Sequence, residues 1–109
     1  MNNSLILVVE DEPEISAIIV SYLEAAGFRT IQAFDGELAY KRFQQLNPDL
    51  ILLDIKIPKC DGIDVLRDIR RISSTPIIML TAMAEDIEKI SALRLGADDY
   101  ILKPFNTLE

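Results

Sequence analysis

The sequence predicts an α/β fold: a doubly wound, five-stranded parallel sheet with helices on both faces. Short apolar runs of strand length alternate along the chain with stretches in which apolar residues recur at helical spacing. The connections between them are short, which is typical of repeated strand–helix units. With 109 residues, half of them hydrophobic, the chain is long enough to form one domain with a substantial core.

The first half of the chain contains three expected strands and two expected helices. Pro13 suits the first position of the first helix, and Gly27 follows the end of that helix. The second helix is expected to end before Pro48, because a proline disfavours helical geometry in the residue before it. The expected strands are Leu5–Val9, Arg29–Phe34 and Leu50–Asp54. The first expected helix begins at Pro13, and the second covers Leu38–Leu46.

The second half continues the alternation. The expected elements are a helix over Ile63–Ile72, a strand over Ile77–Leu80, a helix over Glu85–Leu95 and a strand over Tyr100–Leu102. Residues 106–109 have the composition of the first turn of a fifth helix, which we expect to be truncated. The first, third and fourth strands are nearly all apolar, as expected of strands covered on both faces, so the second and fifth are the expected edges.

Composition excludes several functions. The net charge of −7, from 18 acidic and 11 basic residues, argues against direct binding of DNA or anionic lipid. The absence of histidine removes imidazole bases and histidine-ligated zinc. The single cysteine, Cys60, allows no internal disulfide, and no apolar run reaches the ~20 residues of a membrane helix. We therefore expect a soluble, cytoplasmic protein without a membrane partner.

Polar side chains follow the strands at the edge of the sheet where such folds bind ligands. Glu10 and Asp11 follow the first strand, Asp54 ends the third, Thr81 follows the fourth and Lys103 follows the fifth. Three carboxylates in one cleft would repel one another, and a hard cation such as Mg²⁺ would relieve the repulsion. A carboxylate nucleophile, a cation, an ammonium group and a hydroxyl together suit phosphoryl transfer.

Each of these residues has a simpler explanation when taken alone. Glu10 and Asp11 could cap the first helix, and an aspartate that ends a strand is more often a turn residue than a nucleophile. Thr81 and Lys103 could be an ordinary strand-end hydroxyl and a solvated charge. The functional interpretation depends on convergence, because four separate strand ends contribute complementary groups.

Four motifs resemble one family over the whole chain. They are VVEDE (Val8–Glu12), LLDIKIPKCDG (Leu52–Gly62), IIMLTA (Ile77–Ala82) and GADDYILKPF (Gly96–Phe105). Together they resemble the receiver domain of two-component response regulators, and the last motif is most similar to the OmpR/PhoB-like subfamily of transcription factors. The resemblance implies a flavodoxin-like sheet with strand order 2-1-3-4-5.

The resemblance also implies roles for the strand-end residues. Asp54 would accept a phosphoryl group from a histidine of a partner sensor kinase, with Thr81 and Lys103 bound to the phosphoryl oxygens. Tyr100 would be the aromatic switch that responds to Thr81, and the Lys103–Pro104 bond would be cis. The implied ligands of Mg²⁺, or alternatively Mn²⁺, are Glu10, Asp11, Asp54 and the backbone carbonyl of Lys56. The domain would catalyse only its own phosphorylation and dephosphorylation, so it would not be an enzyme in the usual sense.

The subfamily implies a homodimer when the domain is phosphorylated and complete. The dimer would form through helix 4 (Glu85–Leu95), strand 5 (Tyr100–Leu102) and helix 5, of which residues 106–109 would be the first turn. The charged residues that match this dimer face are Lys89, Asp98, Asp99 and Glu109. We expect residues 1–109 to be the receiver domain. A C-terminal DNA-binding domain, absent from this chain, would be the only part of the parent protein that contacts DNA.

Three other functions remain open at this point. A stand-alone receiver would act by docking to other proteins, and the sequence beyond residue 109 would separate it from a transcription factor. A hydrolytic phosphatase would use Asp54 as its nucleophile, but it needs a general acid, and Glu10 and Asp11 are better placed as metal ligands. A flavin-binding domain is disfavoured because no phosphate-binding loop follows the first strand.

Overall fold

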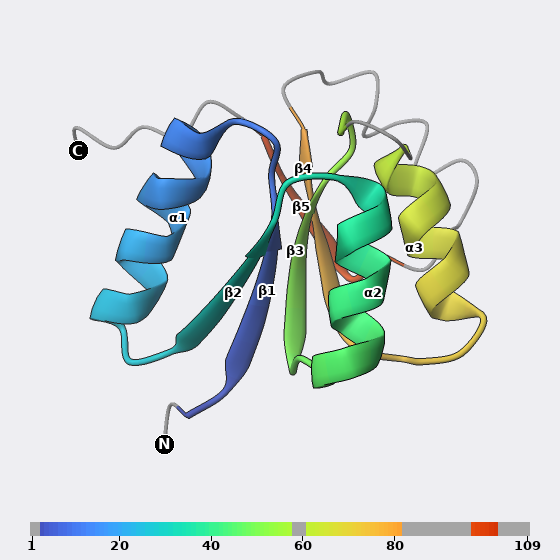
Figure 1. Cartoon of the computed structure of the whole chain (residues 1–109), viewed down its shortest axis with the longest axis horizontal. Helices are drawn as coiled ribbons and strands as arrows, with labels where there is room; N and C mark the ends of the chain where they lie inside the picture. Colours follow the sequence, from blue (N-terminus) through green and yellow to red (C-terminus); the bar gives the residue numbers. More distant parts are fainter. Residues whose placement is uncertain (1–2, 58–60, 82–96, 103–109) are drawn as a thin grey trace.

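A computed structural model describes residues 3–57, 61–81 and 97–102 of the chain. Its elements are β1 (Leu5–Val9), α1 (Pro13–Ala25), β2 (Arg29–Ala33), α2 (Gly36–Leu46), β3 (Leu50–Asp54), α3 (Gly62–Arg70), β4 (Ile77–Thr81) and β5 (Asp99–Leu102). The five strands form one parallel sheet in the order β2-β1-β3-β4-β5 (Figure 1). This order confirms the predicted fold class. The helix expected over 85–95 and the truncated fifth helix lie outside the described residues.

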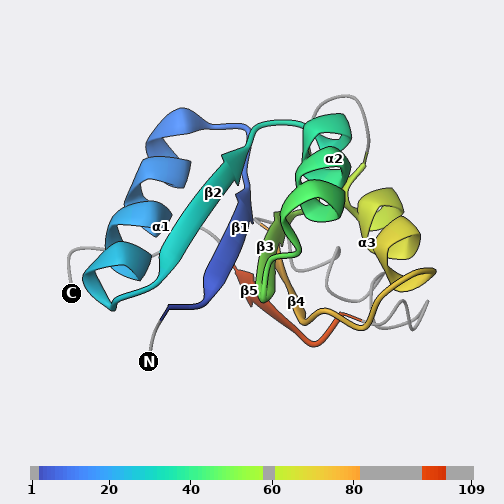
Figure 2. The same ribbon diagram turned by 60° about the horizontal axis from the view of Figure 1, so that its bottom comes forward.

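The helices form a layer on each side of the sheet. In the two views, α1 covers one face, and α2 and α3 lie together on the other (Figures 1 and 2). Alternate residues of each strand therefore enter different cores, because successive side chains of a strand point to opposite faces. In β1, Leu7 and Val9 belong to the α2–α3 core, whereas Ile6 and Val8 belong to the α1 core.

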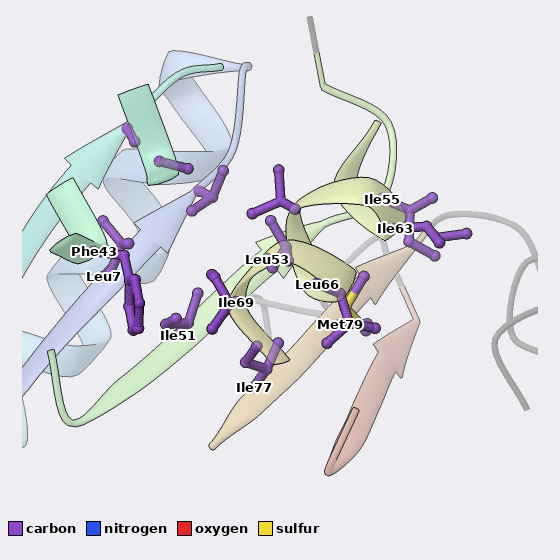
Figure 3. Close-up of a cluster of buried hydrophobic side chains, with 14 residues drawn as sticks. Leu7, Phe43, Ile51, Leu53, Ile55, Ile63, Leu66, Ile69, Ile77 and Met79 are labelled. Carbon is purple, nitrogen blue, oxygen red and sulfur yellow. The ribbon is translucent and has the colours of Figure 1, made fainter. Parts of the chain in front are cut away.

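The core under α2 and α3 is the larger of the two. Phe43 of α2 and Leu66 and Ile69 of α3 pack on Ile51 and Met79 of the central strands (Figure 3). On the other face, Ile19 of α1 packs with Leu52 and Leu80 in a smaller cluster. The central strands are thus covered on both faces, which explains why nearly all of their residues are apolar.

The α1 face of the described structure also contains an apolar groove of about 200 Å³. Its lining residues come from α1, β3, β4 and β5, and they include Ile18, Tyr22 and Ile101, which are all exposed. Within the described residues, the sheet is therefore covered less completely on the α1 face than on the α2–α3 face.

Several element boundaries differ from the sequence-based expectation by one or two residues. α2 begins at Gly36 instead of Leu38, because the Asp35 carboxylate accepts a hydrogen bond from the Leu38 N–H at 2.8 Å and caps the helix. α3 ends at Arg70 instead of Ile72, because the N–H groups of Ile72 and Ser73 both donate to the Ile69 carbonyl in a closing turn. In the part of the chain that is described, we find no helix with the length and apolar character to cross a membrane.

Candidate functional site

Three carboxylates converge at the carboxyl end of the sheet. Glu10 and Asp11 directly follow β1, and Asp54 is the last residue of β3. The two strands are adjacent, with Val9 paired to Leu53, so the residues that follow this pair lie side by side. One carboxylate oxygen from each of the three residues lies within 4.8 Å of the others. The predicted acidic cluster is therefore present, and its members come from segments more than forty residues apart in the sequence.

The three carboxylates differ in their exposure to solvent. Glu10 is fully buried and Asp54 is 4% exposed, whereas Asp11 is exposed. One Glu10 oxygen accepts a hydrogen bond from the Glu12 N–H at 3.1 Å, and one Asp54 oxygen accepts from the Lys56 N–H at 3.2 Å. Backbone donors thus fix the two buried side chains, while Asp11 forms the solvent-facing side of the cluster.

Thr81 extends the same edge on the next strand. It ends β4, it is 2% exposed, and it follows Leu80, which pairs with Asp54 in the sheet. The Ile55 N–H donates to the Leu80 carbonyl at 3.0 Å, which joins β3 to β4 at this end. The carboxyl ends of β1, β3 and β4 therefore bring acidic groups and one hydroxyl to a common edge, as predicted.

The remaining predicted site residues are only partly described. Lys103, Lys89 and Glu109 lie outside the described residues, and Tyr100 is described by its backbone alone, which pairs with Met79. The side chain of Lys56 is exposed. The structure therefore brings together Glu10, Asp11, Asp54 and Thr81 and leaves the other site assignments as predictions.

Asp98 has contacts that its predicted place on the dimer face did not suggest. Its carboxylate accepts hydrogen bonds from the Ile77 N–H at 2.8 Å and from the Arg70 guanidinium at 2.9 Å. Arg70 also donates to the Thr75 carbonyl at 2.7 Å. Asp98 therefore connects α3, β4 and the start of β5 within one molecule, and its neighbour Asp99 is the exposed first residue of β5.

Two residues of structural importance were missed in the sequence. Gly62 appeared in the sequence only as the last residue of the LLDIKIPKCDG motif, but it lies against the backbone of Asp54. The Asp61-Gly62 dipeptide was the available signal for a tight turn at that place. Arg70 carried no signal, because its partners are distant in the sequence or are backbone carbonyls.

The donor set of the acidic cluster fits a hard divalent cation. Three carboxylates within 4.8 Å repel one another, and a cation placed among them would balance their charge. Carboxylate, carbonyl and water oxygens are the ligands that Mg²⁺ prefers, usually with one or two carboxylates and several waters. The cluster combines two buried acids with one exposed acid, so its Asp11 side is open to solvent.

Comparisons with known proteins define the class. Residues 6–109 match the family model of the response regulator receiver domain, and the chain belongs to this family. It is 43% identical over 108 residues to the transcriptional regulatory protein BaeR of Escherichia coli, and 46% identical over 108 residues to the alkaline phosphatase synthesis transcriptional regulatory protein PhoP of Bacillus subtilis. These alignments cover 99% and 98% of this chain, respectively, and 45% of each relative, so the chain spans about half the length of these relatives.

Solved structures agree with this classification. The receiver domain of the Francisella response regulator 1452 has a TM-score of 0.87 at 37% identity, covering 95% of this chain and 87% of that one. The response regulator TrrA of Thermotoga maritima, in complex with Mg²⁺ and BeF, has a TM-score of 0.86 at 38% identity, covering 94% and 89%. The chain is therefore a receiver domain, a module that is phosphorylated on an aspartate in two-component signalling, and its relatives are regulators of the OmpR/PhoB type.

Proposed function

We propose that Asp54 is the phosphoacceptor of a signalling switch. Asp54 is buried at the end of a central strand, and its carboxylate lies within 4.8 Å of two other carboxylates. This cluster of acids at the end of the sheet is the observation that carries the proposal. The Lys56 N–H holds the Asp54 carboxylate in place, and the neighbouring carboxylates could bind a cation that neutralises the incoming phosphoryl group. Such a carboxylate is suited to attack phosphorus.

The phosphoryl donor is proposed to be a histidine of a partner sensor kinase. The 109 residues contain no histidine, so the donor imidazole must lie outside them. In the reaction, an Asp54 oxygen forms a bond to phosphorus, the bond from phosphorus to the histidine nitrogen breaks, and the freed imidazole leaves. The product is an acyl phosphate on Asp54.

The residues proposed to hold Mg²⁺, or alternatively Mn²⁺, are Glu10, Asp11, Asp54 and the backbone carbonyl of Lys56. Support comes from the acidic cluster and from two similar structures, since TrrA is in complex with Mg²⁺ and the receiver domain of PA1611 from Pseudomonas aeruginosa has a magnesium ion in its active-site cleft. The bound cation would neutralise charge on the phosphoryl oxygens. Thr81 would donate a hydroxyl hydrogen bond to the phosphoryl group, and Lys103 would add a positive charge.

The phosphoryl group is proposed to act on β5 through Thr81. Phosphorylation adds about −1.5 to −2 charges, and the arrangement of Thr81 and Lys103 that best binds this charge is favoured. β4 and β5 are neighbours, with Thr81 paired to Leu102 and Met79 to Tyr100. The proposed switch Tyr100 therefore lies on the next strand, two residues along from the partner of Thr81, and a movement of Thr81 would act close to it. The proposed outcome is a homodimer through helix 4, strand 5 and helix 5, to which Lys89, Asp98, Asp99 and Glu109 would contribute.

For the parent protein we propose regulation of transcription. BaeR and PhoP are named as transcriptional regulatory proteins, and this chain spans 45% of each. A DNA-binding domain in the remaining part would supply the DNA contact that the net charge of −7 disfavours for this domain.

A stand-alone receiver is the second candidate, because the chain is also similar to the chemotaxis protein CheY4 of Vibrio cholerae, with a TM-score of 0.86 at 30% identity. The coding sequence after residue 109 separates the two.

The proposal for Asp54 is tested by mass spectrometry. Incubation with Mg²⁺ and acetyl phosphate is expected to add the mass of one phosphoryl group to the unchanged protein and to the Glu14→Gln control, whose side chain is exposed outside the acidic cluster. Asp54→Ala is expected to remain unmodified, because it lacks the nucleophile. An adduct on Asp54→Ala, or none on the unchanged protein, would overturn the assignment.

A further inference from the structure

The first turn of α3 lies directly against the backbone of Asp54. The N–H of the buried residue Gly62 donates to the Ile55 carbonyl at 2.7 Å. A Cβ atom on Gly62 would overlap the Asp54 carbonyl oxygen and would lie 2.8 Å from the Ile55 Cα. These are backbone atoms, so no side-chain rotation relieves the overlap. Glycine is therefore required here for space, and the distance between α3 and β3 is set by this contact.

Neither α3 nor β3 is free to move away from the contact. On one side, Ile63, Leu66 and Ile69 anchor α3 in the main core, where Ile63 belongs to the same cluster as Ile55 (Figure 3). On the other side, the Ile55 N–H donates to the Leu80 carbonyl of β4. The peptide that joins Asp54 to Ile55 is thus enclosed between the buried face of α3 and the neighbouring strand β4.

Asp61 fixes the geometry of this first turn. Its carboxylate accepts a hydrogen bond from the Ile63 N–H at 2.9 Å and serves as the N-cap of α3. An N-cap holds the first turn in helical geometry by bonding a backbone N–H that has no partner within the helix. The cap therefore keeps Gly62 in its position on the Asp54 backbone.

We propose that Asp61 and Gly62 are positioning residues for the phosphoacceptor, a brace that sets where the Asp54 carboxylate lies relative to Glu10 and Asp11. This inference rests on the proposed function of Asp54. The three carboxylates bind a cation together only if their spacing is kept, and a displacement of about 1 Å in a catalytic group costs on the order of 100-fold in rate. The brace fixes the backbone of Asp54, as the Lys56 N–H fixes its side chain.

The direct test is Gly62→Ala, assayed by calorimetric titration with Mg²⁺ and by the rate of phosphorylation with acetyl phosphate. The added methyl group must push the Asp54–Ile55 peptide, so Mg²⁺ affinity and rate are each expected to fall by about tenfold or more. Ile69→Val is the matched control, since it removes a buried methyl group from the same helix, two turns beyond Gly62. Its Mg²⁺ affinity and rate are expected to equal those of the unchanged protein. Unchanged affinity and rate in Gly62→Ala would overturn the inference.

A second pair of variants tests the brace without a steric overlap, and it decides the matter if Gly62→Ala does not fold. Asp61→Asn and Asp61→Ala remove the same charge, but only asparagine keeps a capping oxygen. Asp61→Asn is expected to bind Mg²⁺ like the unchanged protein. Asp61→Ala is expected to bind about threefold or more weakly, a smaller loss than the 10- to 100-fold typical of partners bonded directly to a metal ligand, because Asp61 acts only through the backbone. Equal affinities of the two variants would contradict the role of the cap.

The results also separate the brace from the proposed function. If the unchanged protein takes up no phosphoryl group, the proposed function itself is wrong. If the unchanged protein is phosphorylated and Asp54→Ala is not, while the Gly62 and Asp61 variants behave as their controls, then only the brace is wrong.

Discussion

At the residue scale, the three clustered carboxylates favour cation binding at the expense of stability. Two unit charges about 4 Å apart repel by about 1 kcal/mol even in bulk water, and more strongly where water is partly excluded. Glu10 and Asp54 are buried beside each other, and exposed Asp11 adds a third charge within 4.8 Å. Folding brings these charges together, so the cluster lowers the free energy of unfolding when no cation is bound.

Asp11→Asn is therefore expected to stabilise the metal-free protein. The substitution removes repulsion and keeps the size of the side chain, so the free energy of unfolding in EDTA should rise by about 1 kcal/mol, measured by urea unfolding. With Mg²⁺ present the order should reverse, because the unchanged protein gains binding energy that the variant largely loses. Glu14→Gln, at an exposed position outside the cluster, is the control and should show neither effect. Equal stabilities of Asp11→Asn and this control in EDTA would disprove the repulsion.

At the element scale, side-chain caps determine where two of the helices begin. Asp35 caps α2 and Asp61 caps α3, each through a carboxylate oxygen that accepts a backbone N–H. By contrast, α1 has no side-chain cap on Glu12 and begins with Pro13, which has no N–H group to satisfy. Within the described part of the chain, the first turns of α2 and α3 are therefore satisfied by a side-chain cap, whereas α1 begins with a residue that has no N–H group.

The α2 cap gives a prediction for stability that is separate from the acidic cluster. Asp35→Ala leaves the Leu38 N–H without its side-chain partner and should lower the free energy of unfolding by about 1 kcal/mol. Asp35→Asn keeps a capping oxygen and should lose much less. Chemical unfolding of the three proteins measures the difference, and equal losses in both variants would show that the cap does not contribute.

At the scale of the whole molecule, Arg70 and Asp98 connect three elements at the end of the sheet opposite the acidic cluster. Arg70 ends α3 and donates to the Thr75 carbonyl in the loop before β4, while Asp98 bonds the Ile77 N–H at the start of β4. The Asp98 N–H donates to the Ile77 carbonyl at 2.8 Å. The site edge and the opposite edge of the sheet are therefore both fixed by contacts between distant segments.

A double-mutant cycle with Arg70→Ala and Asp98→Ala is expected to give a coupling energy of about 1 kcal/mol in thermal or chemical unfolding. The pair is a charge-assisted hydrogen bond, in which the Arg70 side chain is 20% exposed and the Asp98 side chain 54% exposed. The pair Arg71 and Asp68 is the matched control, with a similar distance of 2.8 Å but with side chains 72% and 42% exposed. Its coupling should be about 0.3–0.5 kcal/mol, as for exposed helical pairs. Equal couplings for the two pairs would contradict a special role for Arg70.

The predicted elements and the strand-end residues come directly from local patterns. Continuous apolar runs such as Leu50–Leu53 mark buried strands, and the carboxylate of Asp54 at the end of that run pointed to the site. The strand order and the convergence of Glu10, Asp11 and Asp54 are confirmed in the structure. The strands and the residues at their ends were predictable because periodicity and strand ends are properties of neighbouring residues, whereas the full strand order came from the resemblance to the receiver family.

The sequence by itself thus determined the class of fold, the edge of the sheet that carries the site and the kinds of side chain placed there. Only the tertiary structure decided that Gly62 lies on the Asp54 backbone and that Asp98 bonds Arg70 and Ile77. The physical reason is that these contacts join residues from different elements. Their existence depends on how closely α3 packs on β3 and where β5 starts beside β4, and no local pattern in the sequence encodes those distances.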